Sequence, residues 1–434
     1  MSDDLFGSIP EEAKAPPIAE PRPTGAPRLK RPDRHQMRFV PTNLDSLVDE
    51  DHRVRAVWAV VEKLDLARFE DEIAARGETG GRSAIDPSIL VGLWLYGTLE
   101  GIAHARELAR LCEEHHAYRW ICGGVGVNYH TLSDFRVGHE KALDELMTQV
   151  LAVLTHEGLV ELNRVAQDGM RIRASAGAAS FRREPSLQKC LEDARKHVEE
   201  VKRESQDGAL VAKQAARRKS AAQERLQRVE KALAELPKVR EAKKPEDKAE
   251  ARVSTTDPEA RVMKMADGGF RPAYNAQFAT DTKTRVIVGV DVTNIGSDKA
   301  QMAPMLQNIQ NRNDGRLPEE HLVDGGYAKN EAIQEAAQQG VTVYAPVQKP
   351  RTEGIDPHEP KQGDAPEVAA WRQRMGTEQA KEIYKERAAT AETVNADLRG
   401  HRALDKLQVR TIPKVRCVIL WAALAYNILR LIGA

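Results

Sequence analysis

The chain has 434 residues, which is enough for two or three domains and at least one sizeable core. Its 65 lysine and arginine residues are balanced by 65 aspartate and glutamate residues, so the formal net charge is zero. This balance excludes a chain-wide positive field for polyanions, and any surface that binds nucleic acid must be a local patch. The four cysteines are scattered along the chain, which favours reduced thiols in the cytosol over a disulfide framework.

The first segment, residues 1–38, is rich in proline, charged and small residues, and we expect it to be disordered. It contains no hydrophobic signal segment. The longest apolar run lies near the other end, at 417–429, where it is too short to span a bilayer and is followed by Arg430. We interpret this run as a buried C-terminal helix and expect a cytoplasmic protein without a membrane segment.

Residues 39–158 have a helical pattern and are predicted to form an all-α domain. Asp86 followed by Pro87 predicts a helix start, as a capping residue followed by a first-turn proline. Several short helices with tight glycine turns would suit a DNA-binding module of the helix-turn-helix kind. A small helical packing domain explains the same pattern. Apolar residues recur at three- and four-residue spacing in its first helix: Val54, Val57, Trp58, Val61 and Leu64.

A different pattern begins in the remaining part, residues 159–434. Strand-like runs at 165–172, 274–280, 286–292, 321–324 and 341–345 alternate, after the third, with helical stretches. This order predicts an α/β fold, a mixed sheet with helices packed on it. Residues 182–255 interrupt it with a Lys-, Glu- and Ala-rich stretch that predicts a helical or coiled-coil-like insertion. The insertion could mediate dimerisation or be a solvated spacer.

Two stretches carry a local excess of positive charge. Residues 28–38 contain five basic residues and one acid, and residues 399–416 contain six basic residues and one acid. Each stretch is either a patch that contacts DNA or a solvated charged face.

Three carboxylates stand out in the α/β part. Asp168 and Asp324 each end an apolar strand-like run and each precede glycine. An acid at the end of a buried strand is poorly solvated unless a cation or a donor meets it, and strand ends are where α/β sheets keep their sites. Glu392 lies on a later helix with Tyr384 and Arg387. Three carboxylates can hold two divalent metal ions together with substrate phosphates.

These residues resemble the DDE transposases of bacterial insertion sequences, whose catalytic domain has an RNase H-like fold. The resemblance covers nearly the whole chain from about residue 38, and it rests on the order and joint presence of several motifs. Asp168 and Asp324 match the family's first two acids, and Glu392 matches the third. The late helix resembles the family's tyrosine, arginine, glutamate, lysine signature through Tyr384, Arg387, Glu392 and Arg399, with arginine in place of the final lysine.

The resemblance implies that Asp168, Asp324 and Glu392 are catalytic and bind two Mg²⁺ or Mn²⁺ ions. It implies that Tyr384, Arg387 and Arg399 contact double-stranded DNA near the transposon end, and that the protein is a homodimer when bound to DNA. The expected activity is metal-dependent strand cleavage and strand transfer at the ends of the element.

Two alternatives keep the fold but change the function. One is a catalytically inactive, domesticated DNA-binding protein derived from a transposase, and the intact set of three acids counts against it. The other is a different RNase H-like nuclease, and the helical N-terminal region counts against that one.

Overall fold

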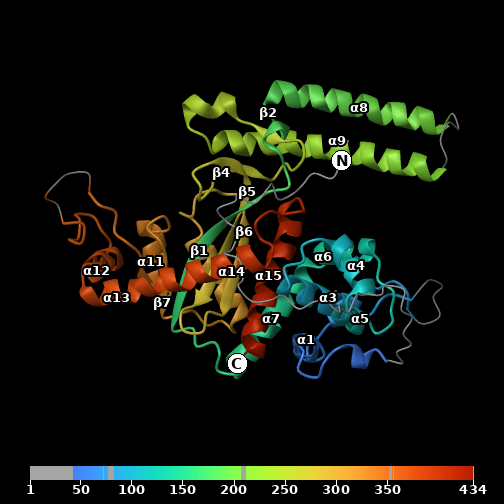
Figure 1. The fold of residues 1–434 in the computed structure, drawn as a ribbon. Helices are drawn as coiled ribbons and strands as arrows, with labels where there is room; N and C mark the ends of the chain where they lie inside the picture. Colours follow the sequence, from blue (N-terminus) through green and yellow to red (C-terminus); the bar gives the residue numbers. More distant parts are fainter. Residues whose placement is uncertain are drawn as a thin grey trace, which may run out of the picture. The chain divides into compact units, whose positions relative to one another are not determined.

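The structure is a computed structural model that describes residues 43–71, 73–76, 83–206, 212–350, 354 and 356–433 (Figure 1). The predicted tail at 1–38, including the basic stretch 28–38, lies outside the described residues.

Short helices make up the N-terminal part, as the periodicity predicts. The side chain of Asp86 accepts a hydrogen bond from the Ser88 amide at the start of α3, and Asn128 caps α6 in the same way. Helix α3 is buried on nearly every side. The elements are η2 (Asp45–Leu47), α1 (Arg53–Val61), α2 (Ala67–Glu70), α3 (Pro87–Leu99), α4 (Ala105–Glu114), α5 (His116–Cys122), α6 (Tyr129–Gly138) and α7 (Glu140–His156).

A mixed sheet follows and confirms the predicted α/β class. Strand β1 (Arg164–Arg173) lies between β5 (Phe270–Asp281), which is antiparallel to it, and β7 (Glu320–Leu322), which is parallel. Strand β8 (Thr342–Tyr344) extends the parallel side. Both β4 (Arg261–Lys264) and β6 (Ile287–Thr293) pair antiparallel with β5. The resulting order β6-β5-β1-β7-β8 is the RNase H-like arrangement that the family resemblance implies.

Helices cover the sheet and continue to the C-terminus. Their bounds are α10 (Met302–Arg312), α11 (Asn330–Gln338), α12 (Pro366–Met375), α13 (Glu378–Arg387), the π-helical turn η5 (Ala388–Glu392), α14 (Thr393–His401) and α15 (Ile412–Ile432). Helix α15 contacts α3, α6 and α7 as well as β6. One hydrophobic core therefore runs from the N-terminal helices through α15 to β5 and β6.

The C-terminal helix α15 is buried as predicted, although it begins earlier than the apolar run suggests. Its length and composition would allow it to cross a membrane, but most of it is buried inside the protein, and the core helix of a soluble protein has the same properties. Two acids hold its first turn, because Asp257 accepts from the Thr411 amide and Glu259 accepts from the Ile412 amide. Tyr274 donates its hydroxyl to Asp257.

The stretch predicted as an insertion contains two long helices, α8 (Glu184–Gln206) and α9 (Ala212–Glu241), which lie side by side (Figure 1). They are flanked by the short elements η3 (Ala178–Ser180), β2 (Phe181–Arg182), η4 (Pro245–Glu250) and β3 (Val253–Ser254). Small apolar clusters that are separate from the main core hold the pair together. The domain boundaries given above stay predictions.

The side chain of Asn427 joins α15 to the backbone of β6, and a substitution tests this contact. Its fully buried amide accepts from the Ile287 amide at 2.9 Å and donates to the Ile287 carbonyl at 2.8 Å. We expect Asn427→Leu to lower the free energy of unfolding by about 2–3 kcal/mol, because it leaves two buried backbone groups of β6 unpaired. Urea unfolding measures the change. The exposed Asn311→Leu is the control, and an equal loss in both variants would contradict this role.

Candidate active site

The two strand-end acids lie on neighbouring strands. The parallel register pairs Ala166 of β1 with Leu322 of β7. Side chains alternate between the faces of a strand, so Asp168 and Asp324, each two residues further on, emerge on the same face as that pair. Burial raises the pKa of Asp168, and the negative charge of Asp324 adds to that rise. That these two acids share a catalytic site stays a prediction.

Asp168 is held by the helix that covers this face. Arg387 at the end of α13 donates from Nη2 to Oδ1 at 3.1 Å, and Asn395 of α14 donates from Nδ2 to Oδ2 at 3.0 Å. Burial raises the pKa of Asp168, and the guanidinium of Arg387 opposes that rise. Both carboxylate oxygens therefore have a donor, and the ion pair is mostly shielded from solvent, with 12% of the Arg387 side chain exposed.

The three remaining residues of the predicted signature lie in different surroundings. Tyr384 of α13 is half-buried, and burial together with Asp324 and Asp168 raises its pKa, so it lies beside the acids. Glu392 and Arg399 are exposed, and no contact joins either one to Asp168 or Asp324. Within the described residues, no three His, Cys, Asp or Glu side chains are grouped closely enough to hold a metal ion.

A further acid, Asp298, lies near Asp168 but on the opposite face of β1, and it was not predicted from the sequence. It follows β6 and its Oδ1 accepts from Asn275 Nδ2 at 2.7 Å and from Gln277 Nε2 at 2.9 Å. Its Oδ2 accepts from Arg171 Nη2 at 3.1 Å. Asp298 sits in a loop between elements, where the sequence carries no strand-end signal. Only the pairing of β1 with β5 brings its three donors together.

Gly169 explains why this cluster can be so tight. A Cβ atom at this position would lie 2.6 Å from Asp298 Oδ1 and 2.5 Å from Gln277 Nε2. A side chain there would push apart the groups that hold Asp298, so the glycine that follows Asp168 is required by close approach.

A buried polar network lies on the face of the sheet opposite Asp168. Gln277 Oε1 accepts from Tyr327 at 2.6 Å and from Gln167 Nε2 at 2.9 Å. His321 Nε2 lies 3.0 Å from Gln167 Oε1. Tyr327 belongs to the turn that carries Asp324, and Gln167 precedes Asp168. The network therefore ties the backbone of one acid to the backbone of the other.

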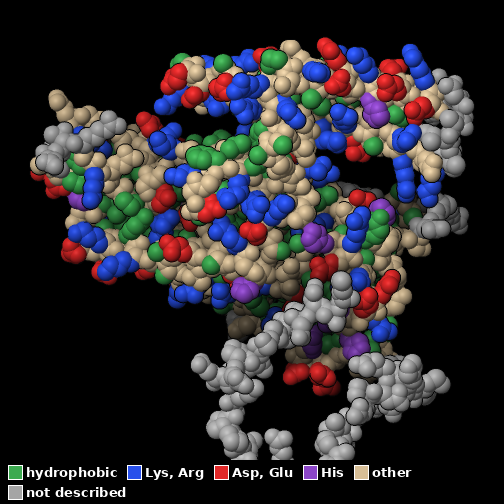
Figure 2. Space-filling model, turned by 45° about the horizontal axis from the view of Figure 1, so that its top comes forward, with side chains coloured by type: hydrophobic (Ala, Val, Ile, Leu, Met, Phe, Trp, Pro, Cys, Tyr) green, Lys and Arg blue, Asp and Glu red, His purple; other side chains and the backbone are tan. Residues whose placement is uncertain are grey.

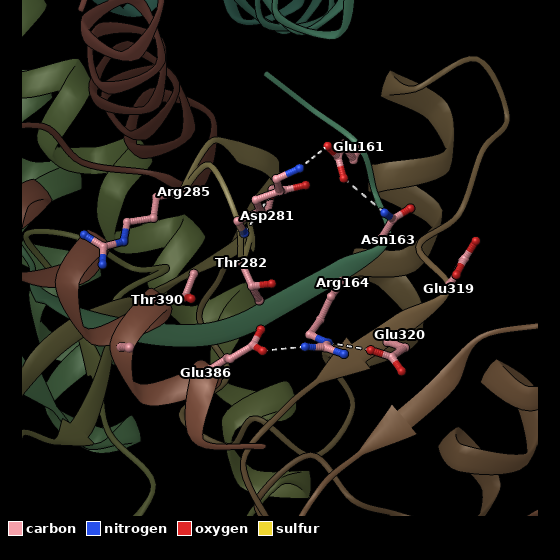
Figure 3. Close-up of a pocket in the computed structure, with 12 residues that line it drawn as sticks. Glu161, Asn163, Arg164, Asp281, Thr282, Arg285, Glu319, Glu320, Glu386 and Thr390 are labelled. Atoms are coloured by element: carbon pink, nitrogen blue, oxygen red, sulfur yellow. Dashed lines mark hydrogen bonds and ion pairs between the residues drawn. The ribbon is translucent and has the colours of Figure 1, made fainter. Parts of the chain in front are cut away.

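A separate cavity lies at the start of β1 (Figure 3). It has a volume of about 670 Å³, and Arg164 reaches across it between Glu320 and Glu386 (Figure 3). Five acids and three basic residues line it, so its charge does not suit a phosphate group. The lining residues are Glu161, Asn163, Arg164, Asp281, Thr282, Lys283, Arg285, Glu319, Glu320, Glu386, Ala389 and Thr390.

Comparison with known families gives two matches. The family model described as "Transposase domain (DUF772)" matches residues 42–137, and the model described as "Transposase DDE domain" matches residues 242–428. The second match includes Asp324 and Glu392 but begins after β1, so Asp168 lies outside it. No curated protein and no solved structure matches the chain.

The buried network has a consequence for stability at acid pH. His321 is fully buried, and burial lowers its pKa from 6.5 to about 4. As the pH falls from about 6.5 to 4, the unfolded chain binds a proton at this residue that the folded chain does not. The free energy of unfolding therefore decreases by up to about 3 kcal/mol over this window. We expect His321→Gln to flatten this dependence in urea titrations at pH 7, 6 and 5, and an unchanged slope would contradict the assignment.

Proposed function

Because the chain is a DDE transposase of the insertion-sequence type, we propose that Asp168, Asp324 and Glu392 form the centre that cleaves and joins DNA strands. The transposase family already implies an enzyme that acts on DNA. What is proposed is the assignment of the reaction to these three residues.

One observation carries the assignment of the first two acids. Asp168 and Asp324 leave neighbouring parallel strands on the same face, under a helix that brings Arg387 to Asp168. Two carboxylates that share a site repel each other, so a pair of this kind is costly to a fold unless a cation compensates it. Arg387 compensates Asp168 in this structure, and a divalent cation offers the same compensation to both acids.

The π-helical turn supports the assignment of Glu392. Glu392 follows Arg387 by five residues, and in a regular α-helix five residues turn the chain about 140° away from the starting face. In a π-helical turn the bond from residue i to residue i+5 brings residue i+5 back over residue i. The turn Ala388–Glu392 therefore returns Glu392 toward the side of the helix that carries Arg387. A change of side-chain rotamer would then bring its carboxylate toward Asp168.

The donor set fits the divalent metal that this family generally uses. Carboxylate oxygens from Asp168 and Asp324 are hard ligands of the kind Mg²⁺ and Mn²⁺ prefer, and Glu392 would supply the third carboxylate of a site for two ions. A bound cation would activate the attacking water or 3′ hydroxyl and stabilise charge on the leaving oxygen. Each oxygen of Asp168 accepts one of these hydrogen bonds, from Arg387 or from Asn395, so a lone pair remains on each for a metal ion.

The neighbouring side chains have roles that follow from their positions. Arg387, once released from Asp168, can bind a DNA phosphate through its guanidinium, and Tyr384 beside it can donate its hydroxyl to the same backbone. Arg399 is exposed about three turns beyond Arg387 and would meet the phosphates further along. Asn395 holds Asp168 in orientation. We propose that the protein acts on double-stranded transposon ends in the cytoplasm, as a homodimer when it is bound to DNA.

The three acids can be tested one at a time. We expect Asp168→Asn, Asp324→Asn and Glu392→Gln each to abolish metal-dependent strand cleavage, because each change removes a charged oxygen ligand but keeps the side-chain shape. Cleavage is measured with DNA that carries the ends of the protein's own element, in the presence of Mg²⁺.

The matched control for Glu392→Gln is Glu382→Gln on the preceding helix α13. Glu382 is exposed and pairs only with Lys385, so its loss should leave cleavage unchanged. A purified variant that folds as the unmodified protein does and cleaves at its rate would remove that acid from the site.

Arg387 gives a separate test through DNA affinity. We expect Arg387→Ala to weaken binding to the element end and to reduce the slope of log affinity against log salt by about one unit, because one phosphate contact is lost. The Asp168→Asn variant should keep the slope. An unchanged slope in Arg387→Ala would mean that this arginine serves only its ion pair with Asp168.

A further inference from the structure

A second cleft opens at the carboxyl end of β1, the strand that carries Asp168. It has a volume of about 520 Å³ and lies between the end of β1, the start of β5 and the loop that leads into α15. The residues that line it are Arg173, Ala174, Ser175, Ala176, Gly177, Ala178, Thr256, Phe270, Arg271, Pro272, Lys406, Gln408 and Arg410.

Four of the lining residues are cations and none is an acid. Elsewhere the two signs are interspersed over the face drawn in Figure 2. Arg173 and Lys406 make no ion pair within the described part of the chain, and their backbones are bridged where β1 ends. Arg410 donates to the Ser175 carbonyl, whereas Arg271 pairs with the exposed Asp267. The cleft therefore presents a concentrated positive charge that few internal partners neutralise.

The basic residues of the stretch 399–416 have two different roles in the fold. Arg402 is buried and binds Asp397 and the Leu99 carbonyl, and Arg416 binds Asp144. These two arginines have structural roles. Lys406 and Arg410 of the same stretch face the cleft.

An exposed aromatic ring stands at this cleft. Phe270 begins β5 after a tight turn from β4, and 70% of it is exposed. Among the exposed large apolar side chains of the described residues, Phe270 is the most open. Basic groups beside an exposed ring are the combination that binds single-stranded nucleic acid, because phosphates meet the cations and bases stack on the ring.

We propose that this cleft holds a strand of the substrate DNA beside the strand that is cut, with its phosphates on Arg173, Lys406 and Arg410 and an unpaired base stacked on Phe270. The proposal rests on the proposed function, since it extends the DNA path from the acid site. Arg173 follows Asp168 by five residues of strand, a distance of about 17 Å. The separation is an odd number of residues, so Arg173 and Asp168 leave β1 on opposite faces, and the strand held in the cleft passes around the end of β1.

The electrostatic part is tested with the double variant Arg173→Ala/Lys406→Ala. Binding of a short mixed-sequence duplex and of oligothymidylate is followed by fluorescence anisotropy over a series of salt concentrations. We expect the slope of log affinity against log salt to fall by about two units for the duplex, and somewhat less for the single strand. The control is Lys238→Ala/Lys283→Ala, which removes two exposed lysines that pair with glutamates away from the cleft. Equal slopes in both double variants would overturn the proposal.

The stacking part is tested with Phe270→Ala. We expect affinity for oligothymidylate to fall roughly five- to one-hundred-fold, with the salt slope unchanged, because a base loses its ring but no phosphate loses its cation. The control is Val262→Ala, an exposed apolar residue on the adjacent strand β4. If Phe270→Ala binds oligothymidylate as the unmodified protein does, Phe270 does not stack on a base.

The assignment of the three acids and the role of the cleft can each be contradicted without the other. Asp168→Asn should bind both probes as the unmodified protein does but not cleave. If Asp168→Asn still cleaves, the assignment of the acids is wrong while the cleft is judged by its own binding data. If Asp168→Asn loses cleavage and the cleft variants keep both affinity and salt slope, only the cleft proposal is wrong. Thermal unfolding of each variant confirms that the fold is retained.

Discussion

The pairing of β1 with β7 is the constraint on which the rest of the site depends. Because the two strands are parallel and in register from Arg164 to Ala166, the acids that follow them emerge together at one edge of the sheet. A shift of one residue in either strand would turn one acid to the opposite face. The buried contacts among Gln167, Gln277 and Tyr327 hold this register from behind.

The two faces of the central strands have different tasks. On one face, Asp168 is met by donors from a helix more than two hundred residues later in the chain. On the other, Gln277 is hydrogen-bonded to Gln167 and Tyr327, and it also donates to Asp298, which pairs with Arg171. An acid that exchanges an arginine for a metal ion needs a partner that can move away. Side chains that hold the strands in register need partners that stay in place.

The family match and the strand pairing concern different acids. The DDE match covers Asp324 and Glu392 and begins after β1, where the long helices α8 and α9 separate β1 from the rest of the sheet. Asp168 is brought near Asp324 by the pairing of β1 with β7. The exposed position of Glu392 and the π-helical turn before it distinguish this residue from the two strand-end acids, whose backbones are fixed by the sheet.

The sequence by itself determined most of the elements and singled out the two strand-end acids as candidates, because periodicity, caps and the pattern of an acid followed by glycine are local. It also determined the family, through the order of its motifs. The tertiary structure alone decided which partners those residues have. Asn395 on Asp168, Asp298 beside Gly169 and the cations around Phe270 come from segments far apart in the chain. Local patterns carry no information about such contacts, since they depend on strand register and on where helices return to the sheet.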